Sequence, residues 1–205
     1  MLWLAIVAAA AGCTKAEGPR AEYDSETGRL RTLAFDATGG GKNNAVGYLE
    51  GSKMRRIELD LDANGSIDRW DFYDADGKLE KVGLSQRNDG RMDAEAFYTA
   101  DGALRLMRIS TRRDGTFDRS EYYENNLMVR SEEDTNRDGK TDKWDTYRPA
   151  GNVPPGVQPY AITSTAFDET GRGTPTRRMF YGPGGRVERI EVDPDGDGLF
   201  TVRPR

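Results

Sequence analysis

The sequence predicts an all-β protein, a repetitive antiparallel β-hairpin meander with about 25 residues per repeat. Three observations predict it. A loop rich in Asp, Asn and Gly recurs along the chain, an aromatic run follows each loop, and a tight turn follows each aromatic run. The segments between these landmarks have strand length and no sustained helical period. Such self-similarity is typical of repeat proteins, in which each unit packs on its neighbours.

The loop glycines mark the period. They lie 24 to 32 residues apart, at Gly41, Gly65, Gly90, Gly115, Gly139, Gly171 and Gly198. In the second unit, Phe72 and Tyr73 follow the loop, a turn at 74–77 comes next, and a strand-like run at 78–84 completes the unit. Asp-Gly turns between such runs are hairpin signals. We expect about twelve to fourteen short strands, in a sheet that is curved, solenoid-like or two-layered and so covers its aromatic side.

The composition limits the function classes. Hydrophobic residues make up 36% and charged residues 32% of the 205 residues, which favours a thin sheet over a thick core. A net charge of -5 without a basic stripe gives no support for nucleic-acid binding. The chain has no His and one Cys, so a Ser-His-Asp or Cys-His set cannot form. Nothing marks a catalytic carboxylate pair among the many acids, and we expect no enzyme.

The N-terminus has the features of a targeting segment. Residues 2–11 are an apolar run too short to span a bilayer as a helix, and the run ends in Ala-Ala-Gly before Cys13. This ending resembles the lipobox of bacterial lipoproteins, which implies a signal peptide at 1–12 and lipidation of Cys13. A plain secretory signal or a buried N-terminal strand is the alternative. Residues 13–21 then form the lipidated tether, and 22–205 form the repeat domain.

One segment breaks the period. Residues 149–160 contain several prolines, which cannot donate ladder hydrogen bonds, so we expect an inserted loop there. The insertion is either simply tolerated or a partner-binding loop with Tyr160 as its contact residue.

Two twelve-residue stretches, 60–71 and 134–145, place acidic or amide oxygens at positions 1, 3, 5, 9 and 12, with Gly at position 6. A calcium loop needs that layout. The predicted ligands are Asp60, Asp62, Asn64, Asp68, Asp71, Asp134, Asn136, Asp138, Asp142 and Asp145. A third loop offers Asp193, Asp195 and Asp197 without an acidic twelfth residue. Because Asp at position 12 is shorter than the usual Glu, we expect Ca²⁺ to bind weakly, with a Kd of about 10⁻⁴ to 10⁻³ M. The alternative is that these acids only form turns.

The middle loops carry arginine where the others have Asp or Asn. Arg87 and Arg112 stand at position 3 of the loops that begin at residues 85 and 110, each with two Asp in the same loop. Our hypothesis is that these guanidinium groups take the place of the ion. The loop that begins at Asp168 has few acids and is expected to be only a turn.

The twelve-residue loops resemble EF-hand and dockerin-type calcium loops and the loops of FG-GAP β-propellers, although β-type runs flank them. Segments 23–30 and 73–79 are similar to the YD-repeat signature of bacterial surface proteins. The array with its lipobox resembles bacterial repeat lipoproteins without an assigned activity. This resemblance implies lipid anchoring in the bacterial cell envelope, at the outer membrane or cell surface, with an envelope protein or a polysaccharide as partner.

We therefore expect a calcium-stabilised β-repeat surface for binding or scaffolding. A metal-free structural lipoprotein, whose acidic loops are only turns, is the alternative. A carbohydrate-binding protein that uses an aromatic face is the third class.

Overall fold

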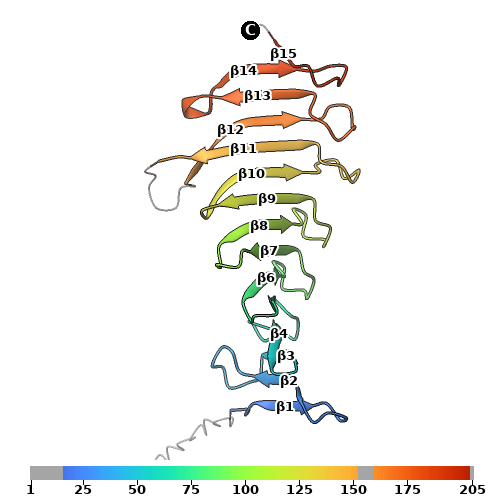
Figure 1. Cartoon of the computed structure of the whole chain (residues 1–205), viewed down its shortest axis with the longest axis vertical. Helices are drawn as coiled ribbons and strands as arrows, with labels where there is room; N and C mark the ends of the chain where they lie inside the picture. Colours follow the sequence, from blue (N-terminus) through green and yellow to red (C-terminus); the bar gives the residue numbers. More distant parts are fainter. Residues whose placement is uncertain (1–15, 152–158, 204–205) are drawn as a thin grey trace, which may run out of the picture.

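The structure is a computed structural model that describes residues 16–151 and 159–203. Cys13, the signal segment 1–12 and the centre of the 149–160 insertion lie outside the described residues. All fifteen strands belong to one sheet, in the order of the sequence, and each pairs antiparallel with its neighbours (Figure 1). The strands are β1 (Arg20–Tyr23), β2 (Leu30–Phe35), β3 (Ala45–Glu50), β4 (Lys53–Leu59), β5 (Arg69–Tyr73), β6 (Leu79–Leu84), β7 (Ala94–Tyr98), β8 (Leu104–Ile109), β9 (Arg119–Glu124), β10 (Leu127–Glu133), β11 (Lys143–Pro149), β12 (Tyr160–Phe167), β13 (Arg177–Tyr181), β14 (Val187–Val192) and β15 (Thr201–Val202). The predicted hairpin meander is confirmed.

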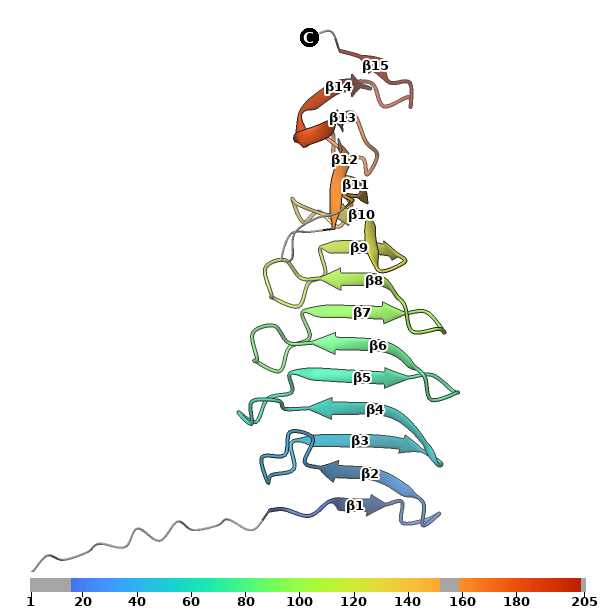
Figure 2. The ribbon, with the colours of Figure 1, turned by 90° about the vertical axis from the view of Figure 1, so that its left-hand side faces the viewer.

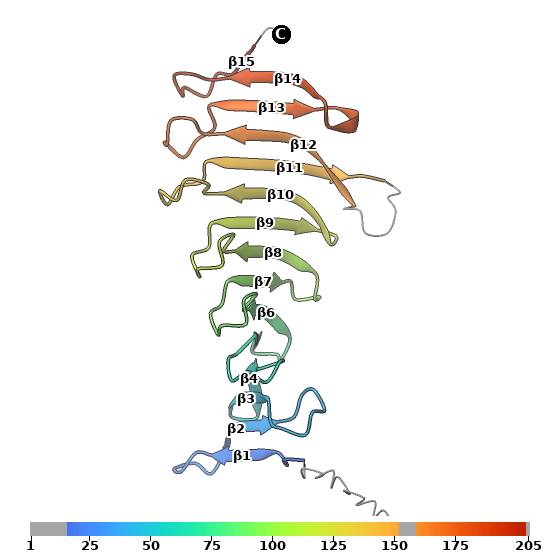
Figure 3. The ribbon, with the colours of Figure 1, turned by 180° about the vertical axis from the view of Figure 1, so that it is seen from behind.

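The sheet is one open, twisted layer. Figure 2 shows β2 to β9 broadside, whereas Figure 3 shows β8 to β14 broadside after a quarter turn of the view, so the sheet twists about its long axis. The strands that pack closely are neighbours in sequence. The sequence left open a curved, solenoid-like or two-layered sheet; the structure has one open, twisted layer, and the sheet does not fold over to cover an aromatic side.

The twist has a regular source in the hairpins. Each pair of an odd-numbered strand with the next even-numbered one has one register shift near its connection, which is a tight turn in every pair except β11 and β12, where it is the insertion. The pairs joined across the acidic loops are regular. A β-bulge adds right-handed twist to the strand that carries it. Seven bulges spaced along the array therefore keep the sheet from being flat.

Few apolar residues are fully covered. Among the described residues, the buried apolar ones are three alanines, one valine and one methionine, namely Ala45, Ala94, Ala96, Val82 and Met128. Apart from Tyr23, which is exposed, the aromatic side chains of the strands are half-buried. They were expected to form the core, but in a single layer each ring is covered only by its neighbours on the same face.

Long charged side chains supply part of that cover. The Arg56 guanidinium lies 4.2 Å from the centre of the Tyr48 ring and 3.1 Å from Glu58, and the Tyr48 hydroxyl donates to Glu58 at 2.8 Å. The arrangement recurs in Tyr122, Arg130 and Glu132. Because such side chains bury their stems along apolar surface and keep their charge in water, a sheet with 36% hydrophobic residues can fold without a second layer.

The ends of the predicted segments differ slightly from the structure. β1 begins at Arg20, inside the segment expected to be a tether. At the insertion, Pro149 pairs with Tyr160, and the Tyr160 ring contacts Tyr147 edge-on with centroids 5.3 Å apart. In the described part of the chain, no helix is both long and apolar enough to cross a bilayer.

Candidate metal centre

Seven loops join an even-numbered strand to the next odd-numbered one and therefore lie at the same ends of the strands; those after β8, β10, β12 and β14 line the left side of Figure 3. Six have nine residues, and in the last, position 9 is Thr201, the first residue of β15. We call all seven the edge loops and number their residues 1 to 9. They begin at Asp36, Asp60, Ser85, Ser110, Asp134, Asp168 and Asp193.

The edge loops share one pattern of hydrogen bonds, which we call the loop frame. In loop 60–68, the Asp60 carboxylate at position 1 accepts from the N–H of Gly65 at 2.8 Å, and the Asp68 carboxylate at position 9 accepts from the N–H of Leu61 at 2.7 Å. The loop is tied to the next one, because the N–H of Ser85 donates to the Asp68 carbonyl at 2.8 Å. Position 4 has a positive φ in every edge loop, as at Ala63 (φ 59°). The turn therefore needs a side-chain oxygen acceptor at positions 1 and 9, which Asp supplies in most loops and Ser, Asn or Thr in the others.

This frame corrects the register of the sixth loop. The N–H of Gly173, not that of Gly171, donates to the second carboxylate oxygen of Asp168, at 2.5 Å. Gly171, with φ 71°, stands at position 4. With Gly173 as the landmark, the interval to Gly198 is 25 residues, like the earlier ones, and the whole irregularity falls in the repeat that holds the insertion. Counting glycines misplaced this loop because Gly is favoured at both positions.

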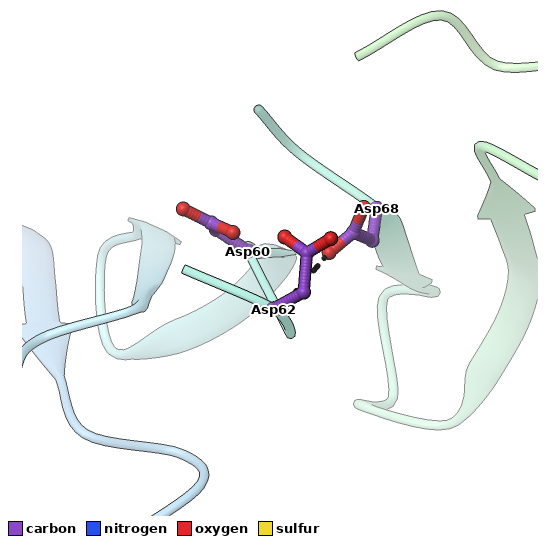
Figure 4. Close-up of side chains that lie close together, drawn as sticks. All are labelled: Asp60, Asp62 and Asp68. Atoms are coloured by element: carbon purple, nitrogen blue, oxygen red, sulfur yellow. Dashed lines mark hydrogen bonds between the residues drawn. The ribbon is translucent and has the colours of Figure 1, made fainter. Parts of the chain in front are cut away.

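The second edge loop brings three carboxylates together. Asp60, Asp62 and Asp68 each offer an oxygen within 4.8 Å of the others. Figure 4 shows the Asp62 carboxylate between those of Asp60 and Asp68. Asp68 is 6% exposed, and its Oδ2 accepts from the N–H groups of Leu61 and Asp62. Its Oδ1 is buried and has no hydrogen-bond partner among the described residues.

This arrangement favours a cation. Carboxylates that share a site repel one another, and a buried carboxylate oxygen without a donor costs free energy. Loop 60–68 contains no Lys or Arg that would compensate for its charge. A hard divalent cation with oxygen ligands, such as Ca²⁺, would supply the missing partner for Asp68 Oδ1.

Two other predicted ligands, Asn64 and Asp71, do not turn an oxygen towards the three carboxylates. Asn64 turns its amide oxygen to the N–H of Ser66 at 2.7 Å and donates from Nδ2 to Asp62 at 3.0 Å. Asp71 lies in β5 and forms an ion pair with Arg69 at 2.6 Å. Because the chain leaves the loop as a strand that rises about 3.3 Å per residue, position 12 is carried about 10 Å along the sheet. Asp71 therefore does not complete the carboxylate group.

The last edge loop forms the second carboxylate group, from Asp193, Asp195 and Asp197. Asp193 is 2% exposed and accepts backbone N–H groups from Gly196, Asp197 and Gly198. Burial acts to raise the pKa of Asp193, but these donors outweigh it and lower the pKa. Like the first group, it lies in a loop without a basic residue.

The loop 134–142 differs from the other two. Both oxygens of Asp142 are engaged, by the N–H and hydroxyl of Thr135 and by the N–H of Asn136. Asp138 donates its N–H to the Asn136 side chain, and Asp134 accepts from the N–H of Gly139. No group of three clustered acids is found here among the described residues.

The twelfth residue of that stretch, Asp145, lies in β11 and accepts from the Thr165 hydroxyl at 2.7 Å. The geometry therefore favours the loops 60–68 and 193–201 over 134–142 as cation sites.

A different arginine takes the role expected of Arg87 and Arg112. Arg87 is exposed and lies 3.9 Å from Asp89, and Arg112 is exposed with no ion pair among the described residues. Arg137, from the fifth edge loop, instead reaches Asp114 in the fourth loop at 2.7 Å. Its hydrogen bond is the main cause that holds the pKa of Asp114 well below the usual range. The sequence signal for Arg137 was its place at position 4, where the other loops have mostly small residues or Asn.

The fold and the loops define a class: a single-layer antiparallel β-repeat with acidic loops along one edge. A scan against protein-family models and a search of curated protein sequences gave no match to this chain. The edge loops themselves are therefore the basis for assigning a function to this chain.

Proposed function

We propose that this protein is a lipid-anchored cell-envelope protein whose β-repeat surface, stiffened by calcium, serves for binding or scaffolding. The observation that carries the proposal is the buried, unpartnered Oδ1 of Asp68 inside the group formed with Asp60 and Asp62. Calcium prefers carboxylate oxygens, and a turn alone has no need for such a group.

The ion would act on the joint between hairpins. Asn64 donates to the carbonyl of Asn88 at 3.2 Å, and Asn88 donates from its side chain to Asp62 at 3.1 Å. The first carboxylate group thus contacts the next edge loop directly. Neutralising the carboxylates would fix the angle between β4–β5 and β6–β7 and would stabilise the folded state by mass action.

The two open faces are the binding surface in this proposal. Rows of half-buried aromatic rings and paired charges are accessible to an envelope protein or a polysaccharide along the whole array. Cys13 anchors the chain to the membrane. Lipidation is tested by fatty-acid labelling of the wild type and of Cys13→Ser, and labelling that persists in the variant would refute it.

A metal-free structural repeat is the second candidate, and one observation favours it. In the first edge loop, the Asp36 carboxylate accepts N–H groups from Gly39, Gly40 and Gly41 without belonging to an acidic group. The loop frame therefore forms from turn chemistry alone.

Calcium titration calorimetry of the full chain in detergent separates the two candidates, with Mg²⁺ for comparison. We expect two calcium ions to bind with Kd values of about 10⁻⁴ to 10⁻³ M. Asp68→Asn should remove one and Asp195→Asn the other, whereas Asp76→Asn should remove neither. Asp76 is the matched control because it is exposed and lies in a tight turn on the opposite edge. Absence of calcium binding in the wild type would establish the metal-free alternative.

A further inference from the structure

Arg137 closes the fourth edge loop from outside it. Its Nη1 lies 2.7 Å from Asp114 and its Nη2 lies 3.0 Å from Asp118. The Asp118 side chain is 4% exposed, so the guanidinium neutralises a buried carboxylate. Arg137 stands at position 4 with φ 64°, and its side chain extends back over the preceding loop. A planar guanidinium that bridges two carboxylates supplies both charge and hydrogen bonds where a metal ion would otherwise be required.

The third edge loop has the same residue types but lacks this contact. Asp89 and Asp93 occupy positions 5 and 9, as Asp114 and Asp118 do in the fourth loop. Asp93 is 1% exposed, its Oδ1 accepts from the N–H of Gln86 at 2.9 Å, and its Oδ2 is buried without a partner among the described residues. The third loop thus presents a buried carboxylate oxygen that still needs a donor.

The donor stands at the equivalent place in the next loop. Arg113 occupies position 4 of the fourth loop with φ 56°, the same left-handed backbone as Arg137. Its side chain is exposed and forms no ion pair in the described part of the chain. Arg113 lies in the loop that directly follows that of Asp89 and Asp93, as Arg137 lies in the loop that directly follows that of its own two partners.

We infer that the edge loops are of two kinds, and that Arg113 closes the third loop by bridging Asp89 and Asp93. Loops that begin with Ser close on a guanidinium from the following loop, whereas the loops 60–68 and 193–201, which begin with Asp and gather three carboxylates, remain open to a divalent cation. The second half of this inference depends on the proposed function, but the role of Arg113 does not.

Charge matching explains the division. Ser at position 1 leaves two carboxylates, at positions 5 and 9, which one guanidinium can satisfy. Asp at position 1 contributes a further carboxylate, for which a divalent cation is the better match. Only the loops that begin with Ser85 and Ser110 are followed by Arg at position 4. The other edge loops with a successor are followed there by Ala63, Asn88, Gly171 and Gly196.

The consequence is a division of the array. Arg113 and Arg137, which we call the arginine clamps, make the centre of the sheet, from β6 to β11, independent of calcium. Calcium acts towards the ends, at loops 60–68 and 193–201.

Thermal unfolding of the full chain in EDTA tests the clamps without any contribution from calcium. We expect Arg113→Gln and Arg137→Gln each to lower the melting temperature by roughly 3 to 6 °C. Arg112→Gln, the adjacent exposed arginine, is the matched control and should leave it unchanged. Arg137→Lys keeps the charge but cannot bridge two carboxylates, so it should lie between the wild type and Arg137→Gln, and it serves in place of Arg137→Gln if that variant does not fold.

A double-mutant cycle then shows whether Arg113 acts through its proposed partner. If Arg113 bridges Asp89, the effects of Arg113→Gln and Asp89→Asn are coupled, and the double variant loses less stability than the sum of the singles. Additive effects, or an Arg113→Gln melt that matches that of Arg112→Gln, would overturn the inference. Failure of the calcium proposal is a separate result, because it shows as an absent calcium shift in the wild type.

Discussion

Asp68→Asn should remove most of the calcium-dependent stabilisation of this protein, because Asp68 carries the buried oxygen that lacks a partner. For a Kd of about 10⁻⁴ to 10⁻³ M, about 10 mM calcium stabilises the folded state by about 1.4 to 2.7 kcal/mol per site. For a chain of this length that is a rise in melting temperature of about 3 to 11 °C.

The two sites should contribute unequally. Loop 60–68 lies between β4 and β5, inside the array, so its ion stabilises strands on both sides. Loop 193–201 ties down only β15, which forms two residue pairs with β14. In a repeat protein, a contact at the end protects the end and adds little to the rest. Asp195→Asn should therefore leave the calcium shift of the main melt nearly intact and expose β15 to faster hydrogen exchange.

The assay is circular dichroism melting of the wild type, Asp68→Asn, Asp195→Asn and the control Asp76→Asn, in EDTA and across a calcium titration. A calcium shift in Asp68→Asn equal to that of the wild type would refute the assignment. An equal shift with Mg²⁺ would show that general screening, rather than a calcium site, produces the effect.

Three further predictions follow from the contacts. Burial acts to raise the pKa of Asp168, but N–H donors in its loop lower the pKa from 3.8 to about 2. The stabilisation that Asp168 provides is therefore complete above about pH 5 and is lost between about pH 4 and pH 2. Stability that does not change down to pH 2, in an acid titration followed by circular dichroism, would contradict this. Gly83→Ala should lower stability by no more than about 1 kcal/mol, because a Cβ there would meet the flexible end of the Met92 side chain, which can move aside, and a loss of several kcal/mol in urea unfolding would count against it. Thr165→Val removes the hydroxyl donor to Asp145, which is 4% exposed, and should cost about 1 to 3 kcal/mol in the same assay; a neutral result would mean that Asp145 finds another donor.

The predicted fold followed from local signals and was confirmed. Asp-Gly turns, strand-length runs and a period of about 25 residues determine a hairpin meander, because neighbouring strands in sequence pair most readily. The single layer was not predictable in the same way. Whether a sheet folds over depends on how well its side chains cover one another, as Arg56 covers Tyr48, and the pattern of hydrophobic residues does not contain that information.

The candidate site was predicted in part. Asp60, Asp62 and Asp68 come together because the nine-residue loop places positions 1, 3 and 9 close to one another. The twelfth residues, Asp71 and Asp145, were assigned on the resemblance to loops that continue into helices, and in this chain a strand follows instead.

The repeat, the strands, the turns and the acidic loops could all be predicted from the sequence, since each depends on residues close together in the chain. Which loops gather carboxylates, and which take an arginine from the next repeat, became visible only in the three-dimensional structure. Asp118 and Arg137 belong to different loops, and their pairing requires two hairpins to be stacked in register. Stacking brings charges from separate repeats into contact, and that contact decides where this protein has a use for a metal ion.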